Sequence, residues 1–77
     1  MDVTVRLHGI LRDRLPVEAK GRTTLNLPED ARIADAINQL ALVGHLQVAH
    51  NDVVIDDLAL PLHDGDTIEV FLPVAGG

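Results

Sequence analysis

The stretch DARIADAINQLAL, residues 30–42, contains the clearest helical pattern in this chain of 77 residues. Its apolar residues recur at i, i+4, i+7 and i+8, which places them along one face of an amphipathic helix: Ile33, Ile37, Leu40 and Ala41. Asp30 can cap the first turn, Asp35 adds negative charge near the positive end of the helix dipole, and Gly44 marks the end. The sequence therefore predicts one main helix.

Strand patterns precede this helix. Apolar and polar residues alternate in DVTVRLH, residues 2–8, and again in RTTLNL, residues 22–27, as in half-buried strands. Between them, residues 9–16 break the alternation, with a glycine and a proline at the two ends and leucines spaced as on a helical turn. The sequence predicts two strands separated by a helical turn or a compact loop.

A hairpin and a last strand follow the helix. Asn51 and Asp52 stand between two short apolar runs, and they favour a two-residue turn because both residue types tolerate positive φ. Residues 56–66 then form an irregular return that ends in the turn sequence Asp-Gly-Asp. The last predicted strand is TIEVFLP, residues 67–73.

The order strand, strand, helix, hairpin, strand is typical of an α+β fold. In this fold one main helix packs across one face of a mixed sheet of about four to five strands. The helix also provides the long crossover that parallel strand pairing requires. We expect residues 1–72 to form the folded domain and residues 73–77 to form a flexible tail that ends in Gly-Gly.

The composition limits the partners and locations that are expected for this chain. Twelve acidic residues against six basic ones give a formal charge of -6, which repels nucleic acid, and an aromatic content of 1% leaves no surface on which bases could stack. A domain this acidic is expected to dock on a basic patch of another protein. There is no basic region followed by an apolar run at the start, and no apolar stretch approaches about 18 residues. We therefore expect no signal peptide, no membrane partner and a cytoplasmic location.

Residues for catalysis and metal binding are scarce. The chain contains no cysteine and no serine, which excludes a thiolate metal site and the commonest nucleophiles. The four histidines lack metal-ligand spacing and are expected at the surface: His8, His45, His50 and His63. Five aspartates lack the pattern of a calcium loop and are interpreted as turn formers: Asp52, Asp56, Asp57, Asp64 and Asp66. We expect a protein that is not an enzyme and holds no metal.

The last predicted strand has two different faces. Ile68, Val70 and Leu72 form the more aliphatic face, which should meet the helix, whereas Phe71 points away from the core. Aromatic side chains are favoured as anchors at protein interfaces, so Phe71 is a candidate docking residue. The alternative interpretation is that residues 10–15 cover this side chain.

Gly76 and Gly77 follow this strand closely. Without Cβ atoms they form a thin thread that can enter a narrow cleft, and the extended chain from Pro73 to Gly77 spans roughly 17 Å. The tail could therefore carry the carboxylate of Gly77 into the active site of a partner. A carboxylate is a poor electrophile because its leaving group would be oxide. An adenylating partner would activate it as a mixed anhydride with phosphate.

The stretch LHDGDTIEVFLPVAGG, residues 62–77, resembles the C-terminal part of the MoaD/ThiS sulfur carriers, and VTVRLHGILRDRL, residues 3–15, is similar to the molybdopterin branch of that family. The resemblance implies a ubiquitin-like β-grasp fold. It also implies that an E1-like enzyme uses ATP to adenylate the terminal glycine, while the carrier itself binds no cofactor. The glycine then becomes a thiocarboxylate that donates sulfur. The nearest branch contains the small subunit of molybdopterin synthase, whose partner is the larger synthase subunit.

The resemblance assigns roles to the last residues. Gly77 is expected to be the site of adenylation and of the thiocarboxylate, with Gly76 and Ala75 as the tail behind it. Four residues are expected at the partner surface: Phe71, Leu72, Pro73 and Val74. The chain departs from the family at the helix start, where a threonine or serine cap is usual and Arg32 stands instead. Asp30 would then have to provide the cap.

Other functions share the same features. The sulfur acceptor could be the thiazole of thiamine or another precursor. The activated Gly77 could also form isopeptide bonds with lysines, which would make the chain a ubiquitin-like protein modifier. Finally, the domain could be a binding module that uses its sheet face.

Overall fold

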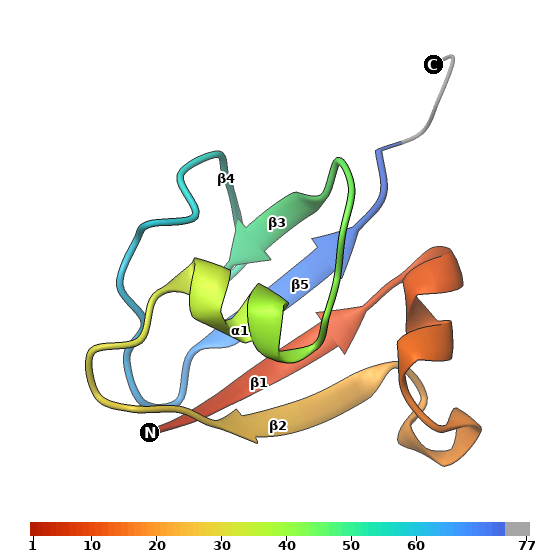
Figure 1. Ribbon diagram of the computed structural model, residues 1–77, viewed down its shortest axis with the longest axis horizontal. Helices are drawn as coiled ribbons and strands as arrows, with labels where there is room; N and C mark the ends of the chain where they lie inside the picture. Colours follow the sequence, from red (N-terminus) through yellow and green to blue (C-terminus); the bar gives the residue numbers. More distant parts are fainter. Residues whose placement is uncertain (74–77) are drawn as a thin grey trace.

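Within residues 1–73, which the computed structural model describes, five strands form one mixed sheet and one α-helix lies across one face of it (Figure 1). The strands are β1 (Asp2–Leu7), β2 (Arg22–Asn26), β3 (Gln47–His50), β4 (Val53–Ile55) and β5 (Thr67–Phe71). The helices are α1 (Ile33–Gln39) and the two short 3-10 helices η1 (Gly9–Arg14) and η2 (Val17–Ala19). The predicted α+β fold with a mixed sheet is confirmed.

The strands lie in the order β2-β1-β5-β3-β4, so the last strand of the chain is the middle strand of the sheet. β5 runs parallel to β1, with Val5 opposite Ile68, and antiparallel to β3, with Val48 opposite Val70. The parallel pair needs a long crossover, and the segment containing β2 and α1 supplies it. Both edges of β5 therefore pair with strands that are far away in sequence.

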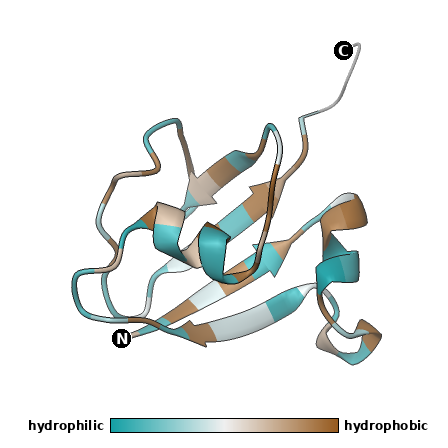
Figure 2. Cartoon of the chain, in the orientation of Figure 1, coloured by the Kyte–Doolittle hydropathy of each residue, from teal (hydrophilic) through white to brown (hydrophobic). Residues whose placement is uncertain are grey.

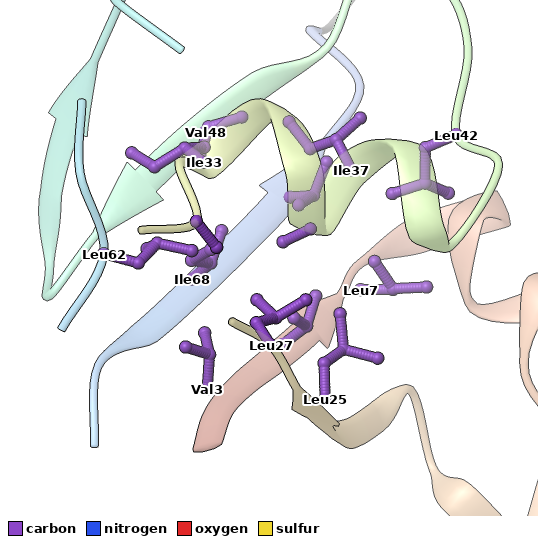
Figure 3. Close-up of a cluster of buried hydrophobic side chains, with 14 of the residues drawn as sticks. Val3, Leu7, Leu25, Leu27, Ile33, Ile37, Leu42, Val48, Leu62 and Ile68 are labelled. Atoms are coloured by element: carbon purple, nitrogen blue, oxygen red, sulfur yellow. The ribbon is translucent and has the colours of Figure 1, made fainter. Parts of the chain in front are cut away.

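The core lies between α1 and the sheet. Hydrophobic and hydrophilic segments alternate along β1 (Figure 2), and its inward residues Val3 and Val5 are 0% and 1% exposed. Ile33 and Ile37 descend from the helix onto side chains of the sheet such as Ile68 (Figure 3). The inward-facing apolar side chains of the strands and those of the helix thus pack into one layer, which removes them from water. Leu72 was predicted on this face but is 42% exposed, because β5 ends at Phe71.

The helix is shorter than residues 30–42, and its start differs from the prediction. Arg32 is the residue at the N-cap position, and its N–H donates to Oδ2 of Asp35 at 2.7 Å. The prediction that Asp30 caps the helix is therefore wrong. The physical reason lies in the return segment, whose backbone carbonyl groups at Leu60 and Leu58 accept the N–H groups of the first helical turn at 3.1 and 2.9 Å. Tertiary hydrogen bonds thus satisfy backbone N–H groups of the first helical turn, for which the sequence had predicted a side-chain cap.

The helix also ends earlier than the predicted stop at Gly44. Ala41 adopts a left-handed conformation with φ of 55° and donates its N–H to the carbonyl of Asn38 at 3.0 Å. The N–H of Leu42 reaches back to the carbonyl of Ile37 at 3.2 Å, and both of these residues are buried. This pair of hydrogen bonds is a Schellman motif with alanine where glycine is usual. Burial of Leu42 requires the reversal here, three residues before the glycine.

Two local predictions are confirmed. Asn51 and Asp52 both have positive φ, 49° and 71°, and connect β3 to β4 in a tight hairpin. The segment between β1 and β2 contains the predicted helical turn as η1, and its Leu11 is buried. These positions follow from short-range turn chemistry, which explains why the sequence alone located them.

Candidate functional site

The candidate site lies where β5 ends. Because β5 is the middle strand, the chain leaves the sheet between the ends of β1 and β3 (Figure 1). Leu72 and Pro73, which follow the strand, are both exposed. Val74, Ala75, Gly76 and Gly77, which carry the predicted tail and thiocarboxylate, lie outside the described residues. We call the surface formed by His8, Glu69, Phe71, Leu72 and Pro73 the exit surface.

Phe71 is half-buried on the face of the sheet opposite the helix. It pairs with Gln47 of β3, and the ring of His8 stands edge-on to its ring, with centroids 5.9 Å apart and planes at 77°. His8 is the residue between β1 and η1, and its backbone N–H donates to the carbonyl of Val70 at 3.0 Å. The aromatic ring of Phe71 is thus partly covered by His8. This residue lies just before residues 10–15, which the alternative interpretation of the sequence expected to cover the ring. Phe71 keeps part of its surface accessible.

Glu69 joins this surface to its basic neighbours. One carboxylate oxygen, Oε1, lies 3.3 Å from Nε2 of His8 and 3.8 Å from Nη1 of Arg6. The His8 and Arg6 side chains are about half exposed, at 48% and 54%. Ion pairs this accessible to water contribute little to stability. Their effect is to orient an imidazole and a carboxylate beside Phe71, which makes the exit surface suited to recognition.

Residues 1–73 contain neither a metal-binding cluster nor a helix that could span a membrane. No three histidine, aspartate or glutamate side chains in this range gather closely enough to hold a metal ion. No helix among these residues has the length and apolar character needed to cross a bilayer. His8, His45 and His63 are exposed, as predicted.

The remaining histidine belongs to a polar cluster that the sequence did not reveal. His50 was predicted at the surface, but its side chain is only 19% exposed, and Nε2 lies 2.7 Å from Oδ2 of Asp66. Asn51 donates to Oδ1 of Asp66 at 3.1 Å, and the backbone N–H of His63 donates to Oδ2 at 2.9 Å. Asp66 is thus more than a turn former, since it is 8% exposed and ties the β3–β4 hairpin to the start of β5.

Two opposing effects act on the pKa of Asp66. Burial raises it, but the hydrogen bonds from His50, Asn51 and the His63 N–H outweigh burial and hold the pKa below the ordinary value of 3.8. The cluster lies at the start of β5, whereas the exit surface lies at its end. Its role is therefore structural. The only sequence signal for it was the Asn-Asp turn, which does not show that Asp66 folds beneath the hairpin.

A mixed sheet in this strand order, wrapped around one helix, is the ubiquitin-like β-grasp fold. Proteins with this fold carry diverse functions, so the fold alone does not define the family. The ThiS family matches residues 5–77, nearly the whole chain, and this protein belongs to that family of small carrier proteins. The predicted membership of the MoaD/ThiS group is confirmed.

Solved structures agree with this placement. One structure, a complex of subunits 1 and 2 of molybdopterin-converting factor from Helicobacter pylori 26695, contains a chain 32% identical with a TM-score of 0.67, and the match covers 100% of both chains. The putative molybdopterin converting factor subunit 1 from Pyrococcus furiosus is 24% identical with a TM-score of 0.78, over 96% of this chain and 99% of that one.

SAMP1 from Haloferax volcanii is 20% identical with a TM-score of 0.75, and the match covers 100% of each chain. At this identity, the similarity to SAMP1 and to the Pyrococcus furiosus protein establishes the fold alone. No curated protein matches the chain.

Proposed function

We propose that this protein is a sulfur carrier for molybdopterin biosynthesis, in which the carboxyl group of Gly77 is the reactive group. The observation that carries the proposal is the extent of the ThiS family match, which continues through residue 77 and so includes Gly76 and Gly77. β5 leads to these residues from the middle of the sheet. The folded domain therefore serves partner binding, and the reaction takes place at the carboxyl group of Gly77.

The chemical steps follow from the weak reactivity of a carboxylate. An E1-like enzyme binds ATP, and the Gly77 carboxylate attacks the α-phosphorus to form an acyl-adenylate with release of pyrophosphate. A sulfide nucleophile then attacks the carbonyl carbon and displaces AMP, which leaves a thiocarboxylate. If the nucleophile is a persulfide, its terminal sulfur displaces AMP to form an acyl disulfide, and a thiol must then attack the other sulfur, which releases the thiocarboxylate and leaves a disulfide. The carrier supplies the substrate group, and its partners supply the catalytic residues.

The proposed acceptor of the loaded carrier is the larger subunit of molybdopterin synthase. Support comes from the Helicobacter pylori structure, in which a chain 32% identical to this one is subunit 1 in a complex with subunit 2 of molybdopterin-converting factor. The exit surface suits such a partner, since it offers half-buried Phe71 with exposed Leu72 and Pro73 next to the reactive tail. Val74 would continue the contact, and Ala75 and Gly76 would form the tail that leads to Gly77.

The experiment is intact-mass analysis of the protein before and after incubation with ATP, a sulfide source and an E1-like enzyme that is active on another carrier. We expect a mass gain equal to the replacement of one oxygen by sulfur, located on the peptide that contains Gly77. Two matched variants, one lacking Gly77 and one extended by a single alanine, should fold normally and show no gain. A gain in either variant would contradict a reaction at the Gly77 carboxyl group.

The same reaction mixtures separate the alternatives. Conjugates of higher mass that survive reducing denaturation would indicate a protein modifier. A thiocarboxylate that restores molybdopterin formation with the larger synthase subunit supports the proposal. A thiocarboxylate that donates sulfur only to a thiazole precursor or another acceptor would assign the protein to a different sulfur pathway.

A further inference from the structure

A cleft beside the exit surface concentrates positive charge in this acidic protein. It has a volume of about 480 Å³ and lies where β1, η1, η2 and β2 meet. Four of the six lysine and arginine residues of the chain line it, together with His8: Arg6, Arg12, Lys20 and Arg22. We call this the basic cleft.

The fold holds the charges together against their repulsion. Arg6 of β1 stands directly opposite Arg22 of β2, and like charges at such cross-strand positions are destabilising. Arg12 lies over Gly21, where an added Cβ would come within 2.9 Å of Nε of Arg12 and within 2.7 Å of the carbonyl oxygen of Leu7. The glycine, with φ of 75°, therefore leaves the space in which Arg12 lies.

Most of this charge lacks an internal counterion. Arg6 shares Glu69 with His8, but no carboxylate among residues 1–73 forms an ion pair with Arg12, Lys20 or Arg22. The guanidinium groups keep their forked donors available for an external anion, and arginine binds carboxylates and phosphates in this way. The arrangement lowers stability slightly and is suited to an anionic ligand.

The position of the cleft indicates which kind of anion binds there. His8 lines it and also contacts Phe71, so the basic cleft and the exit surface are continuous. Because removal of the four cleft charges from the formal charge of -6 leaves -10 on the rest of the chain, an extended polyanion would be repelled on all sides of the cleft. A short acidic segment of a protein would meet only the cleft.

We infer that the basic cleft binds the carboxylate side chains of an acidic segment on the E1-like enzyme that activates the Gly77 tail. This inference rests on the proposed function for the identity of that protein. The contact would orient the carrier and speed the encounter, with Phe71 providing the apolar anchor next to it. The expectation from net charge, docking on a basic patch of a partner, is reversed at this surface.

The cleft can be tested without any partner. The full chain, labelled with ¹⁵N, is titrated with a short capped oligoglutamate peptide at low salt while its amide resonances are recorded. We expect saturable shifts in residues 6–12 and 19–22, and their loss in the double variant Arg12→Glu, Lys20→Glu. The matched control is Arg14→Glu with Arg32→Glu, which makes the same change in net charge outside the cleft and should retain the shifts.

Three results would overturn the inference. The first is an absence of saturable shifts in the unmodified protein, and the second is equal loss in both double variants. The third is binding of inorganic phosphate, at the same ionic strength, under conditions in which the peptide does not bind. Amide spectra of the free variants show whether each is folded, and Lys20→Glu alone serves if the double variant is not, since the Lys20 side chain is exposed.

Activation kinetics distinguish this inference from the proposed function. With an E1-like enzyme that loads the unmodified protein, the cleft variant should raise KM for the carrier roughly tenfold at low salt and leave kcat unchanged. The difference should shrink as salt is added. An unchanged KM contradicts the acidic docking segment while leaving the sulfur-carrier role intact. Failure of the unmodified protein to be loaded counts against the carrier role, and the peptide titration still decides the cleft.

Discussion

The ring of His8 stands edge-on against the ring of Phe71, with centroids 5.9 Å apart and planes at 77°. The two residues are far apart in sequence, and they meet because β1 and β5 run parallel and end side by side. An edge-to-face arrangement is one of the favoured geometries for a pair of aromatic rings. The pairing of β1 with β5 therefore sets the orientation of Phe71 at the exit surface within the domain itself.

Replacement of Phe71 by alanine should weaken partner binding. We expect a loss of about 1 to 3 kcal/mol in binding free energy, as for an aromatic anchor at an interface. Calorimetric titration of the variant against the E1-like enzyme or the larger synthase subunit measures the effect. The matched control is Val53→Ala, an exposed apolar residue on the edge strand β4, which should bind as the unmodified protein does. Equal affinities for all three proteins would remove Phe71 from the interface.

Acid should destabilise the fold through Asp66. The pKa of this carboxyl is lowered in the folded protein, so its charged form contributes stability above the unfolded value of 3.8. That contribution is lost as the pH falls below 3.8 and through the folded pKa. Chemical unfolding at a series of pH values should therefore show a decline in the free energy of unfolding over this range.

The variant Asp66→Asn tests the assignment. It should lower the free energy of unfolding at neutral pH by about 1 kcal/mol or more, because the amide keeps only one acceptor oxygen and its NH2 group cannot accept the hydrogen bonds made to the other carboxylate oxygen. It should also flatten the decline below pH 3.8. Asp57→Asn, at an exposed loop position, should keep the full decline. If Asp66→Asn keeps it as well, other carboxylates govern the acid response.

Asp35, and not Asp30, should stabilise the helix start. Asp35 accepts the N–H of Arg32 at 2.7 Å, and its charge lies in the first turn of α1. Asp35→Ala should cost about 0.5 to 1 kcal/mol in unfolding free energy. Asp30→Ala removes the same charge two residues before the cap and should change the free energy of unfolding by a few tenths of a kcal/mol at most. Thermal unfolding of both variants makes the comparison, and similar losses would restore Asp30 as a cap.

Glycine at position 41 should stabilise the protein. Ala41 adopts φ of 55° in the Schellman motif, a conformation that costs a residue with a Cβ about 1 kcal/mol. Ala41→Gly relieves this cost, although it adds backbone entropy to the unfolded chain, so a net gain of about 0.5 kcal/mol is expected. Ala36→Gly, inside the same helix, should instead destabilise by about 1 kcal/mol or more. Denaturant midpoints report the sign of each change.

Features that depend on near neighbours in the chain could be predicted from the sequence. Alternation in residues 2–8 and 67–71 located the strands, and the Asn-Asp pair located the hairpin, because side-chain direction and turn conformation are local properties. The apolar stripe identified the helix, and the element order implied a mixed sheet. The outward direction of Phe71 followed from the same alternation.

The ends of the helix and the environment of several polar side chains depend on tertiary contacts. The return segment supplies carbonyl acceptors to the first turn of α1, which makes an aspartate cap at residue 30 unnecessary. Asp66 becomes buried because the hairpin folds over it, and His50 leaves the surface for the same reason. The basic cleft arises when strand register and the Gly21 turn bring together charges that are dispersed along an acidic sequence. Composition sums charge over the whole chain, whereas a partner meets the charge of one surface, and the pairing of distant strands decides which residues form that surface.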